Sequence, residues 1–411
     1  CGSVKSGEEE VVAASRDSKV VVAYVTSWSE VMPDPQYMTH INYAFGHVNE
    51  SFNGVKIDNE ERLRQIVDLR KQKPELKVLL SIGGWGSGRF SEMAANDEYR
   101  RAFAADCARV VKEFALDGID IDWEYPTSSM ANISSSPDDT ENFTLLMQDI
   151  RAAIGNEKEL TLATVASARY IDFKAILPSV DFVNIMAYDM ASAPKHHSAL
   201  YPSGHSGDIT SDGAVTAHLK AGVPPSKLVM GMPFYGRGGD GYPSFQDYNK
   251  VGNTDTQYTE KWDEVAQVPY LADKNDTLVF GFENPRSLAI KCQYILDKDL
   301  LGGMYWDYSG DNEQGDLRRT VAENLLGKPH KAKVLVLTER GGQHGGFTDA
   351  GLRWLAAEGA KGNFSITEIN NARNITEAYL SQFSLVIQLD FPPYTWPKEA
   401  EDAFVKYIEE G

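Results

Sequence analysis

Acidic side chains recur at every second position in one short segment of the chain. The segment begins at Asp117 and continues through Gly118 to Asp120, Asp122 and Glu124. Alternate side chains of a β-strand point to opposite faces, so the last three carboxyl groups would share one face. Carboxyl groups this close repel one another unless they share protons, which raises an apparent pKa and couples their titrations. Groups of this kind are candidates for acid–base chemistry.

The opposite face of the same segment is apolar. It carries Ile119, Ile121 and Trp123, which indicates a strand inside the protein core, where ionised groups are costly. Acidic residues also occur at strand ends and in ion-pair networks, but strict alternation up to Tyr125 favours a functional set. Asp117 falls on the other face, so we predict a structural role for it.

Apolar runs of strand length alternate with amphipathic stretches from residue 20 onward. The strand candidates are residues 20–24, 41–45, 78–82, 118–124, 160–165, 182–188, 228–232 and 303–306. The helix candidates between them are residues 60–73, 98–114, 139–154, 211–221 and 287–298. This alternation predicts an α/β fold with a parallel sheet covered by helices, and eight repeats predict a closed (β/α)8 TIM barrel.

Polar and aromatic residues gather where these strands end. In a barrel of this kind the active site lies at the C-terminal ends of the strands. Besides the acids, the candidates at those ends are Trp85, Met186, Tyr188, Asp189, Tyr235, Arg237 and Trp306. Further aromatic candidates for the lining of a groove are Tyr24, Tyr43 and Phe45. Packing alone does not explain such a set, so we predict one site at the barrel mouth.

Two further parts of the chain depart from the barrel pattern. Residues 238–283 exceed an ordinary loop and predict a small insertion subdomain after the seventh strand, with Trp262, Tyr270 and Phe280 in its own core. After a linker at residues 328–332, residues 333–411 predict a partial doubly wound α/β domain. Its strand candidates are residues 334–337, 364–369 and 385–389, and its helix candidates are residues 348–358, 376–382 and 397–410.

Charge and hydropathy exclude several classes of function. The formal net charge of −19 argues against nucleic acid as a partner, because its phosphates would be repelled. No apolar run is long enough to span a membrane. The three cysteines, Cys1, Cys107 and Cys292, show no metal-binding spacing and no disulfide framework. We expect Cys107 and Cys292 to be buried free thiols.

The first residues have a different character from the rest. Cys1, followed by small residues and an acidic stretch, resembles the start of a mature bacterial lipoprotein, with residues 1–17 as a flexible tether. This resemblance implies membrane attachment through a lipidated Cys1 and a location in the bacterial cell envelope or at its surface; secretion is the alternative. An arbitrary chain start would carry no such meaning.

Residues 18–327 resemble the catalytic domain of glycoside hydrolase family 18, the family of many chitinases. The acidic motif Asp-x-x-Asp-x-Asp-x-Glu is matched from Asp117 to Glu124, and residues 81–85, 186–189, 233–237 and 302–306 match other strand ends of the family. The resemblance implies a retaining hydrolase that cleaves β-1,4-N-acetylglucosamine linkages of chitin or chito-oligosaccharides. It implies no cofactor and no metal, and we expect a monomer.

The same resemblance implies a division of labour among the acids. Ordinary retaining glycosidases use two carboxylates, but this family is an exception in which the 2-acetamido group of the substrate is the nucleophile. Glu124 would protonate the leaving oxygen and then activate water. Asp122 would orient the acetamide, and Asp120 would tune Asp122. Tyr188 would hold the acetamide carbonyl.

The remaining site residues would bind sugar. By resemblance, Asp189 would contact the sugar at the cleaved bond, Trp306 would stack beneath it, and Tyr235 and Arg237 would bind on the neighbouring wall. Two alternatives stay open: an endo-β-N-acetylglucosaminidase acting on N-glycan cores with the same acids, and a non-catalytic glycan-binding lectin.

Residues 333–411 resemble the N-terminal part of a ThuA-like domain, which is related in fold to class I glutamine amidotransferases. Residues 338–344 and 390–394 carry this resemblance. The segment contains no cysteine, which excludes the nucleophile chemistry of the amidotransferases within it.

Overall fold

The computed structural model describes residues 19–239, 241–251, 257–327, 332–338, 345–361, 364–373, 375–389 and 396–410. The chain divides into two compact units, Cys1–Gly327 and Lys328–Gly411, and each is described by itself. Cys1, the predicted tether and most of the residues that carry the ThuA resemblance lie outside the described residues. Within the described part, no helix has the length and apolar character needed to cross a membrane.

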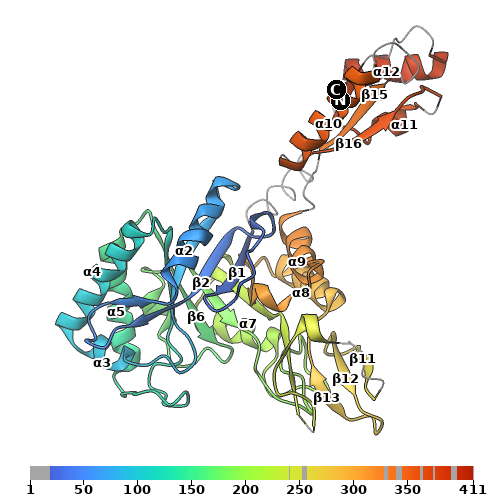
Figure 1. Ribbon diagram of the computed structural model, residues 1–411. Helices are drawn as coiled ribbons and strands as arrows, with labels where there is room; N and C mark the ends of the chain where they lie inside the picture. The colour runs from blue at the N-terminus through green and yellow to red at the C-terminus, as the bar shows by residue number, and fades with distance from the viewer. Residues whose placement is uncertain are drawn as a thin grey trace, which may run out of the picture. The chain divides into compact units, whose positions relative to one another are not determined.

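Eight parallel strands form a closed barrel in the first unit (Figure 1). They are β1 (Val20–Thr26), β2 (His40–Val48), β4 (Lys77–Gly83), β5 (Gly118–Asp122), β6 (Glu159–Val165), β7 (Phe182–Met186), β8 (Leu228–Pro233) and β14 (Gly302–Trp306). Their order is β1-β14-β8-β7-β6-β5-β4-β2, and the pairing of β1 with β2 closes the barrel. The predicted (β/α)8 barrel is confirmed. A short strand, β3 (Val55–Ile57), which the sequence did not predict, pairs antiparallel with β2.

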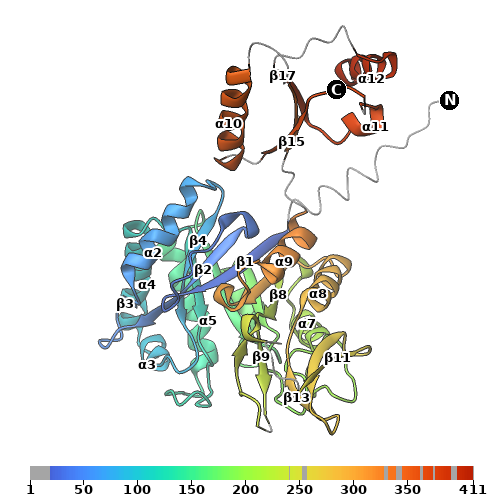
Figure 2. The same ribbon diagram turned by 45° about the vertical axis from the view of Figure 1, so that its right-hand side comes forward.

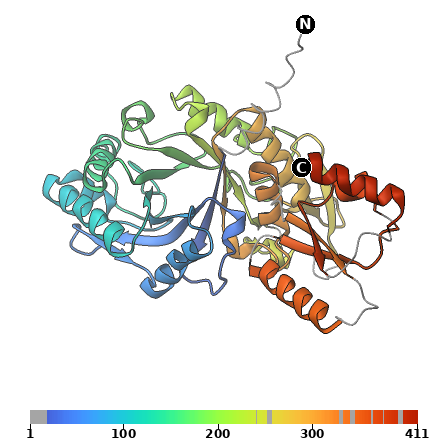
Figure 3. The same cartoon turned by 90° about the horizontal axis from the view of Figure 1, so that it is seen from above.

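Helices surround these strands (Figure 3). They are α2 (Glu60–Val67), α3 (Phe90–Ala95), α4 (Asp97–Glu113), α5 (Asp139–Ile154), α6 (Phe173–Ile176), α7 (Ser211–Lys220), α8 (Pro285–Asp297) and α9 (Asp316–Leu326). The described residues of the unit also form five 3₁₀ turns: η1 (Pro35–Tyr37), η2 (Asp68–Lys71), η3 (Pro225–Lys227), η4 (Tyr248–Lys250) and η5 (Tyr308–Gly310). The helix predicted at residues 60–73 therefore ends as an α-helix at Val67 and continues as a 3₁₀ turn.

The two faces of β5 and the residues that follow it meet different surroundings, as the alternation predicts. Ile119 and Ile121 are fully buried in the core between strands and helices. Trp123 stacks on Phe90 of α3 with ring centroids 5.4 Å apart, and it also contacts Phe143 of α5. The apolar face thus packs on the helix layer, which leaves the acidic face to the barrel interior.

The insertion after β8 forms an antiparallel sheet. Its strands are β9 (Tyr235–Gly238), β10 (Gln246–Asp247), β11 (Thr259–Asp263), β12 (Val268–Ala272) and β13 (Leu278–Gly281), in the order β10-β9-β13-β12-β11. Phe280 and Tyr270 pack in small clusters within this sheet. Trp262 instead lies under the guanidinium group of Arg286 of α8, 3.9 Å from the ring centroid. The sheet begins at Tyr235, three residues before the predicted boundary.

The second unit contains a three-stranded parallel sheet, β16-β15-β17. Its elements are β15 (Ala332–Thr338), β16 (Phe364–Ile369), β17 (Leu385–Leu389), α10 (Gly345–Lys361), α11 (Glu377–Leu380) and α12 (Lys398–Glu410). On β15, Leu335 and Leu337 pack in a core with residues of α11 and α12. Val334 and Val336 pack on the other face with Leu355 of α10. Helices therefore cover both faces of the sheet, as in a doubly wound fold (Figure 2).

Candidate active site

Asp120 lies inside the barrel and is held by three hydroxyl groups. Its Oδ2 accepts hydrogen bonds from the Tyr24 hydroxyl at 2.7 Å and the Ser81 hydroxyl at 2.9 Å, and its Oδ1 accepts one from Thr161 at 2.7 Å. Burial raises the pKa of Asp120, although these hydrogen bonds oppose the rise. Because Asp120 has no exposed surface, it acts on its neighbours and not on a ligand.

Asp122 and Glu124 form a hydrogen-bonded pair above Asp120. Burial, followed by the charges of Glu124 and Asp120, raises the pKa of Asp122 well above its usual range. Burial and the charge of Asp189 raise the pKa of Glu124 to about 7, against the hydrogen bonds from Asp122 and Tyr125. The pair therefore keeps at least one proton near neutral pH, and Asp122 supplies the hydrogen bond to Glu124.

Tyr188 stands beside this pair, just past the end of β7. Burial, followed by the charges of Asp122 and Asp189, raises the pKa of its hydroxyl group well above the ordinary value. The hydroxyl group therefore stays protonated. It points toward the Met304 sulfur at 3.7 Å, a weak acceptor, so a ligand oxygen would bind it more strongly.

Asp189 is fixed by two side chains of β9. Its Oδ1 accepts hydrogen bonds from the Tyr235 hydroxyl and from Nε of Arg237, both at 2.8 Å. Burial opposes ionisation, but polar contacts with His197 and Arg237 outweigh it and hold the pKa of Asp189 below its usual range. The side chain remains 44% exposed, so this anion is accessible from the groove.

Aromatic rings build the walls of a groove of about 630 Å³ above the carboxyl pair. Trp306 stacks on Phe45 with centroids 5.6 Å apart and also contacts Tyr24 and Trp28. Trp85 lines the same groove and is 62% exposed. Every predicted site residue except Asp120 and Tyr43 lines this groove: Tyr24, Phe45, Trp85, Asp122, Glu124, Met186, Tyr188, Asp189, Tyr235, Arg237 and Trp306.

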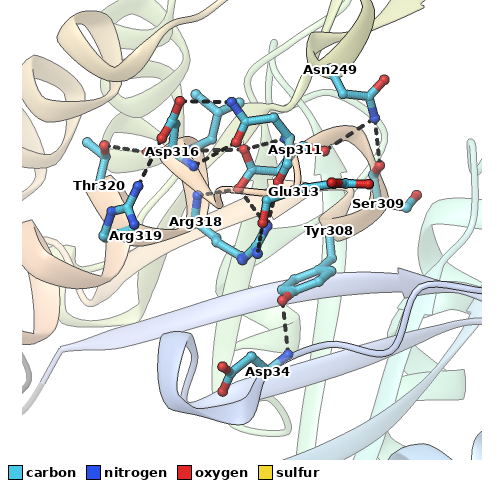
Figure 4. Close-up of polar contacts among 12 residues, drawn as sticks. Asp34, Asn249, Tyr308, Ser309, Asp311, Glu313, Asp316, Arg318, Arg319 and Thr320 are labelled. Atoms are coloured by element: carbon cyan, nitrogen blue, oxygen red, sulfur yellow. Dashed lines mark hydrogen bonds and ion pairs between the residues drawn. The ribbon is translucent and has the colours of Figure 1, made fainter.

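The segment that follows Trp306 is anchored by a buried carboxylate (Figure 4). Asp311 accepts hydrogen bonds from the backbone N–H groups of residues at the start of α9 and from the guanidinium group of Arg318. Nearby, the Tyr308 hydroxyl accepts the backbone N–H of Asp34 at 2.9 Å. The loop after β1 and the loop after β14 are thereby tied together on the side of the groove where Trp306 lies.

Several residues of the groove escaped the sequence analysis. They are Trp28, Tyr125, Met130, Tyr170 and Phe245, together with small and apolar residues at the ends of β6 and β7. They lie in loops, where no periodic pattern marks a side chain that faces a ligand. Trp28 lies two residues past the end of β1, as Trp85 lies two residues past the end of β4. This position at a strand end could have identified Trp28 as a groove residue.

Tyr43 does not line the groove, contrary to the prediction. Its ring is fully buried between β2 and the helices, and its hydroxyl group donates to the backbone carbonyls of Asp58 and Asn59. Phe45, two residues later, does face the groove. The pairing of β2 with β4 shifts register between Ala44 and Gly46, so the two rings point to opposite sides despite their spacing.

Two glycines allow β4 to approach the acidic segment closely. A Cβ atom on Gly83 would lie 2.0 Å from the carbonyl oxygen of Asp122, and Gly83 has a φ of +127°. A Cβ atom on Gly84 would lie 2.6 Å from the ring of Phe45. The backbone N–H of Gly84 donates to the Asp122 carbonyl at 2.8 Å, so this contact also fixes the carboxyl pair.

The other acidic and sulfur-containing candidates lie away from the groove. Asp117 accepts the backbone N–H of Val78 at 2.8 Å, which ties β4 to β5. Cys107 and Cys292 are buried free thiols, as expected. Among the described residues, no group of His, Cys, Asp or Glu side chains is placed to hold a metal ion.

A closed parallel barrel whose strand ends hold paired carboxyl groups in an aromatic groove defines a glycosidase of the barrel class. The model of the glycosyl hydrolases family 18 matches residues 20–311. The chain belongs to that family. The match ends before the second unit, whose resemblance to ThuA-like domains stays a prediction.

Similar proteins and structures carry chitinase and glucosaminidase names. The chain is 29% identical to Chitinase A1 of Niallia circulans over 74% of this chain and 58% of that protein. It is 31% identical to mouse chitotriosidase-1 over 72% of this chain and 74% of that protein. A family 18 N-acetylglucosaminidase from Paenibacillus barengoltzii matches in structure with a TM-score of 0.69 and 32% identity, covering 75% of this chain and all of that one.

Proposed function

We propose that the barrel hydrolyses β-1,4 linkages between N-acetylglucosamine units of chitin or chito-oligosaccharides, with retention of configuration. The observation that carries the proposal is the hydrogen-bonded pair of Asp122 and Glu124 at the floor of an aromatic groove. A carboxyl group with a pKa of about 7 can donate its proton to a leaving oxygen at neutral pH. Flat aromatic walls suit the apolar faces of sugar rings.

The arrangement of the acids argues for a nucleophile supplied by the substrate. Two carboxylates that act as acid and nucleophile must stand about 5 Å apart across the scissile bond. Asp122 and Glu124 are instead hydrogen-bonded to each other, and Asp120 is enclosed by three hydroxyl groups. Asp189 is bound by Tyr235 and Arg237, which weakens it as a nucleophile.

The substrate's 2-acetamido group then completes the reaction. Its carbonyl oxygen attacks the anomeric carbon while Glu124 protonates the departing oxygen, and a cyclic oxazolinium ion forms. Asp122 accepts the acetamide N–H and stabilises this cation, and the Tyr188 hydroxyl binds the acetamide oxygen. Glu124 afterwards takes a proton from the water that opens the ring. Trp306 stacks under the sugar at the cleaved bond.

Turnover of chitotetraose, with Glu124→Gln as the matched control, tests the proposal. We expect hydrolysis by the unaltered protein and none by the variant, which should still bind the oligosaccharide in calorimetry. Thiazoline analogues of N-acetylglucosamine should inhibit, because they mimic the cyclic intermediate. Absence of inhibition at millimolar concentration would argue against substrate assistance.

The same assay separates the alternatives. Binding of chitotetraose without hydrolysis would indicate a lectin. Release of high-mannose glycans from a glycoprotein, with no action on chitin oligosaccharides, would indicate an endo-β-N-acetylglucosaminidase. The presence of Glu124 beside Asp122 favours catalysis over binding alone. A carboxyl group with a pKa of about 7 can give a proton to the leaving oxygen and later take one from water.

A further inference from the structure

Asp189 adopts a backbone conformation that needs support. Its φ of 54° lies in the left-handed region, which residues other than glycine seldom adopt. The conformation turns the backbone N–H of Asp189 toward the imidazole of His197, and Nδ1 accepts it at 3.1 Å. The next residue is held too, because the Met190 N–H donates to the carbonyl of His197 at 3.0 Å. One histidine therefore fixes two consecutive residues at the end of β7.

The imidazole of His197 lies against both the backbone and the side chain of Asp189. Its Nδ1 accepts the N–H of Asp189 and lies 3.6 Å from Oδ1 of the same residue. The side chain has no exposed surface, and its centroid lies 5.2 Å from the ring of Tyr235. His197 is thus enclosed behind the Asp189–Tyr235 contact and does not itself line the groove.

The insertion anchors the residue that precedes His197. Nε2 of His196 lies 2.9 Å from Oδ2 of Asp263, at the end of β11. The same carboxylate oxygen accepts the hydroxyl group of Ser203 at 2.8 Å. Asp263 therefore binds both ends of a turn in the loop between β7 and α7.

A buried ion pair anchors the residue that follows His197. Lys291 of α8 and Glu283, just past β13, form an ion pair in which neither side chain has exposed surface. Glu283 accepts the hydroxyl group of Ser198 at 2.9 Å, and Lys291 donates to the Ser198 carbonyl at 2.5 Å. Because neither charged side chain has exposed surface, the pair holds Ser198 from the protein interior, through both its side chain and its backbone.

We propose that His197 is a positioning residue for the reaction: it holds Asp189 against the carboxyl pair, and the insertion holds His197. This inference rests on the proposed function and deepens it. The insertion then does more than raise a wall of the groove. It supplies Tyr235 and Arg237, which grip the Asp189 carboxylate, and Asp263 and Glu283, which fix the segment that grips the Asp189 backbone.

The position of Asp189 matters for the proton on Glu124. Four groups face the Glu124 carboxyl: Asp122 and Tyr125 through hydrogen bonds, Asp189 through its charge, and the Tyr188 hydroxyl. The negative charge of Asp189 helps to raise the pKa of Glu124. If Asp189 moves away, the pKa of Glu124 falls, and the protonated acid is lost at a lower pH.

The test compares His197→Leu, which removes the acceptor, with His197→Asn, whose Oδ1 stands close to where Nδ1 stood. For His197→Leu we expect kcat/KM on chitotetraose to fall on the order of 10-fold to 100-fold, because a small displacement of Asp189 in the active site costs this much in rate. The alkaline limb of its pH profile should move to lower pH. His197→Asn should restore both the rate and the limb. Carbon-13 NMR titration of Glu124 in both variants reports the same shift without turnover.

Two controls keep the outcomes distinct. If His197→Leu does not fold, the paired replacement Glu283→Gln with Lys291→Met loosens Ser198 while the imidazole stays, and a smaller shift in the same direction is expected. An alkaline limb and a Glu124 titration that stay unchanged in the folded variants would overturn the inference. Absence of turnover by the unaltered protein would overturn the proposed function instead, and the NMR titration would still decide the role of His197.

Discussion

At the level of single residues, the carboxyl groups on β5 and just past the ends of β5 and β7 differ through their surroundings and not through their chemistry. Asp120 is satisfied by hydroxyl groups, Asp122 shares a proton with Glu124, and Asp189 is held ionised by Arg237. Glu124 is the acid whose pKa is raised to about 7, close to neutrality. Burial is the first cause of that rise, so the groove that receives the sugar also prepares the acid.

The pH profile should reflect this acid directly. Glu124 must be protonated to assist the leaving group, so kcat/KM should be high below pH 7 and fall above it as the proton is lost. Steady-state rates on chitotetraose between pH 4 and pH 9 measure this limb. A profile that stays flat to pH 9 would mean that Glu124 is not the acid.

The raised pKa also predicts a stability effect. The folded state binds the Glu124 proton more tightly than the unfolded chain, because its pKa rises from 4.5 to about 7. The resulting stability is fully present below pH 4.5 and is lost as the pH rises through 7, with an upper bound on the order of 3 kcal/mol.

Glu124→Gln should remove this dependence, since a neutral amide has no proton to lose. In thermal unfolding, the variant should exceed the unaltered protein in Tm at pH 8, and the two should be similar at pH 4. An equal difference in Tm at both pH values would show that Glu124 is not a strained buried acid.

At the level of elements, the placement of the site depends on close packing between β4 and β5. Gly83→Ala would drive a Cβ atom into the Asp122 carbonyl, so we expect a loss of about 3 kcal/mol in the free energy of unfolding and a large fall in kcat. The matched control is Gly155→Ala, which also has positive φ but meets nothing within 4 Å. Denaturant unfolding and chitotetraose turnover measure both effects; normal kcat in a folded Gly83→Ala variant would contradict the account.

Much of the site could be predicted from the sequence because strands alternate. The two-residue period of a strand predicted that the acids share one face. The rule that barrel active sites lie at strand ends predicted Trp306 at the end of β14. Tyr43 was misplaced because a register shift in β2 breaks the alternation, and no local pattern announces such a shift. His197 could not be predicted because its position depends on long-range contacts, which the sequence of a loop does not reveal. Trp28 could have been predicted, because it lies two residues past the end of β1.

At the level of the whole molecule, the two units have separate hydrophobic cores. The clusters around β15 contain only residues after 331, and the barrel clusters contain only residues before 328. Deleting residues 328–411 should therefore leave kcat/KM on chitotetraose within about twofold and the Tm of the barrel unchanged. Calorimetry on both chains measures the second quantity. A barrel that loses cooperative unfolding on deletion would show that the units depend on each other.

The barrel accounts for the chemistry, and the insertion accounts for its alignment. Strand ends bring the acids to one mouth, while the sheet of β9 to β13 holds the Asp189 carboxylate through Tyr235 and Arg237. Substrate assistance joins these parts, because Asp120 and Asp122 are held by hydrogen bonds and Tyr235 and Arg237 bind the Asp189 carboxylate.

The rates on chitotetraose and on cellotetraose test substrate assistance most directly. The two substrates share the β-1,4 backbone, but cellotetraose has a hydroxyl group where chitotetraose has the acetamido group. Substrate assistance predicts hydrolysis of chitotetraose, with the β-anomer formed first in proton NMR, and no detectable hydrolysis of cellotetraose. Comparable hydrolysis of both substrates, or the α-anomer as the first product, would contradict it.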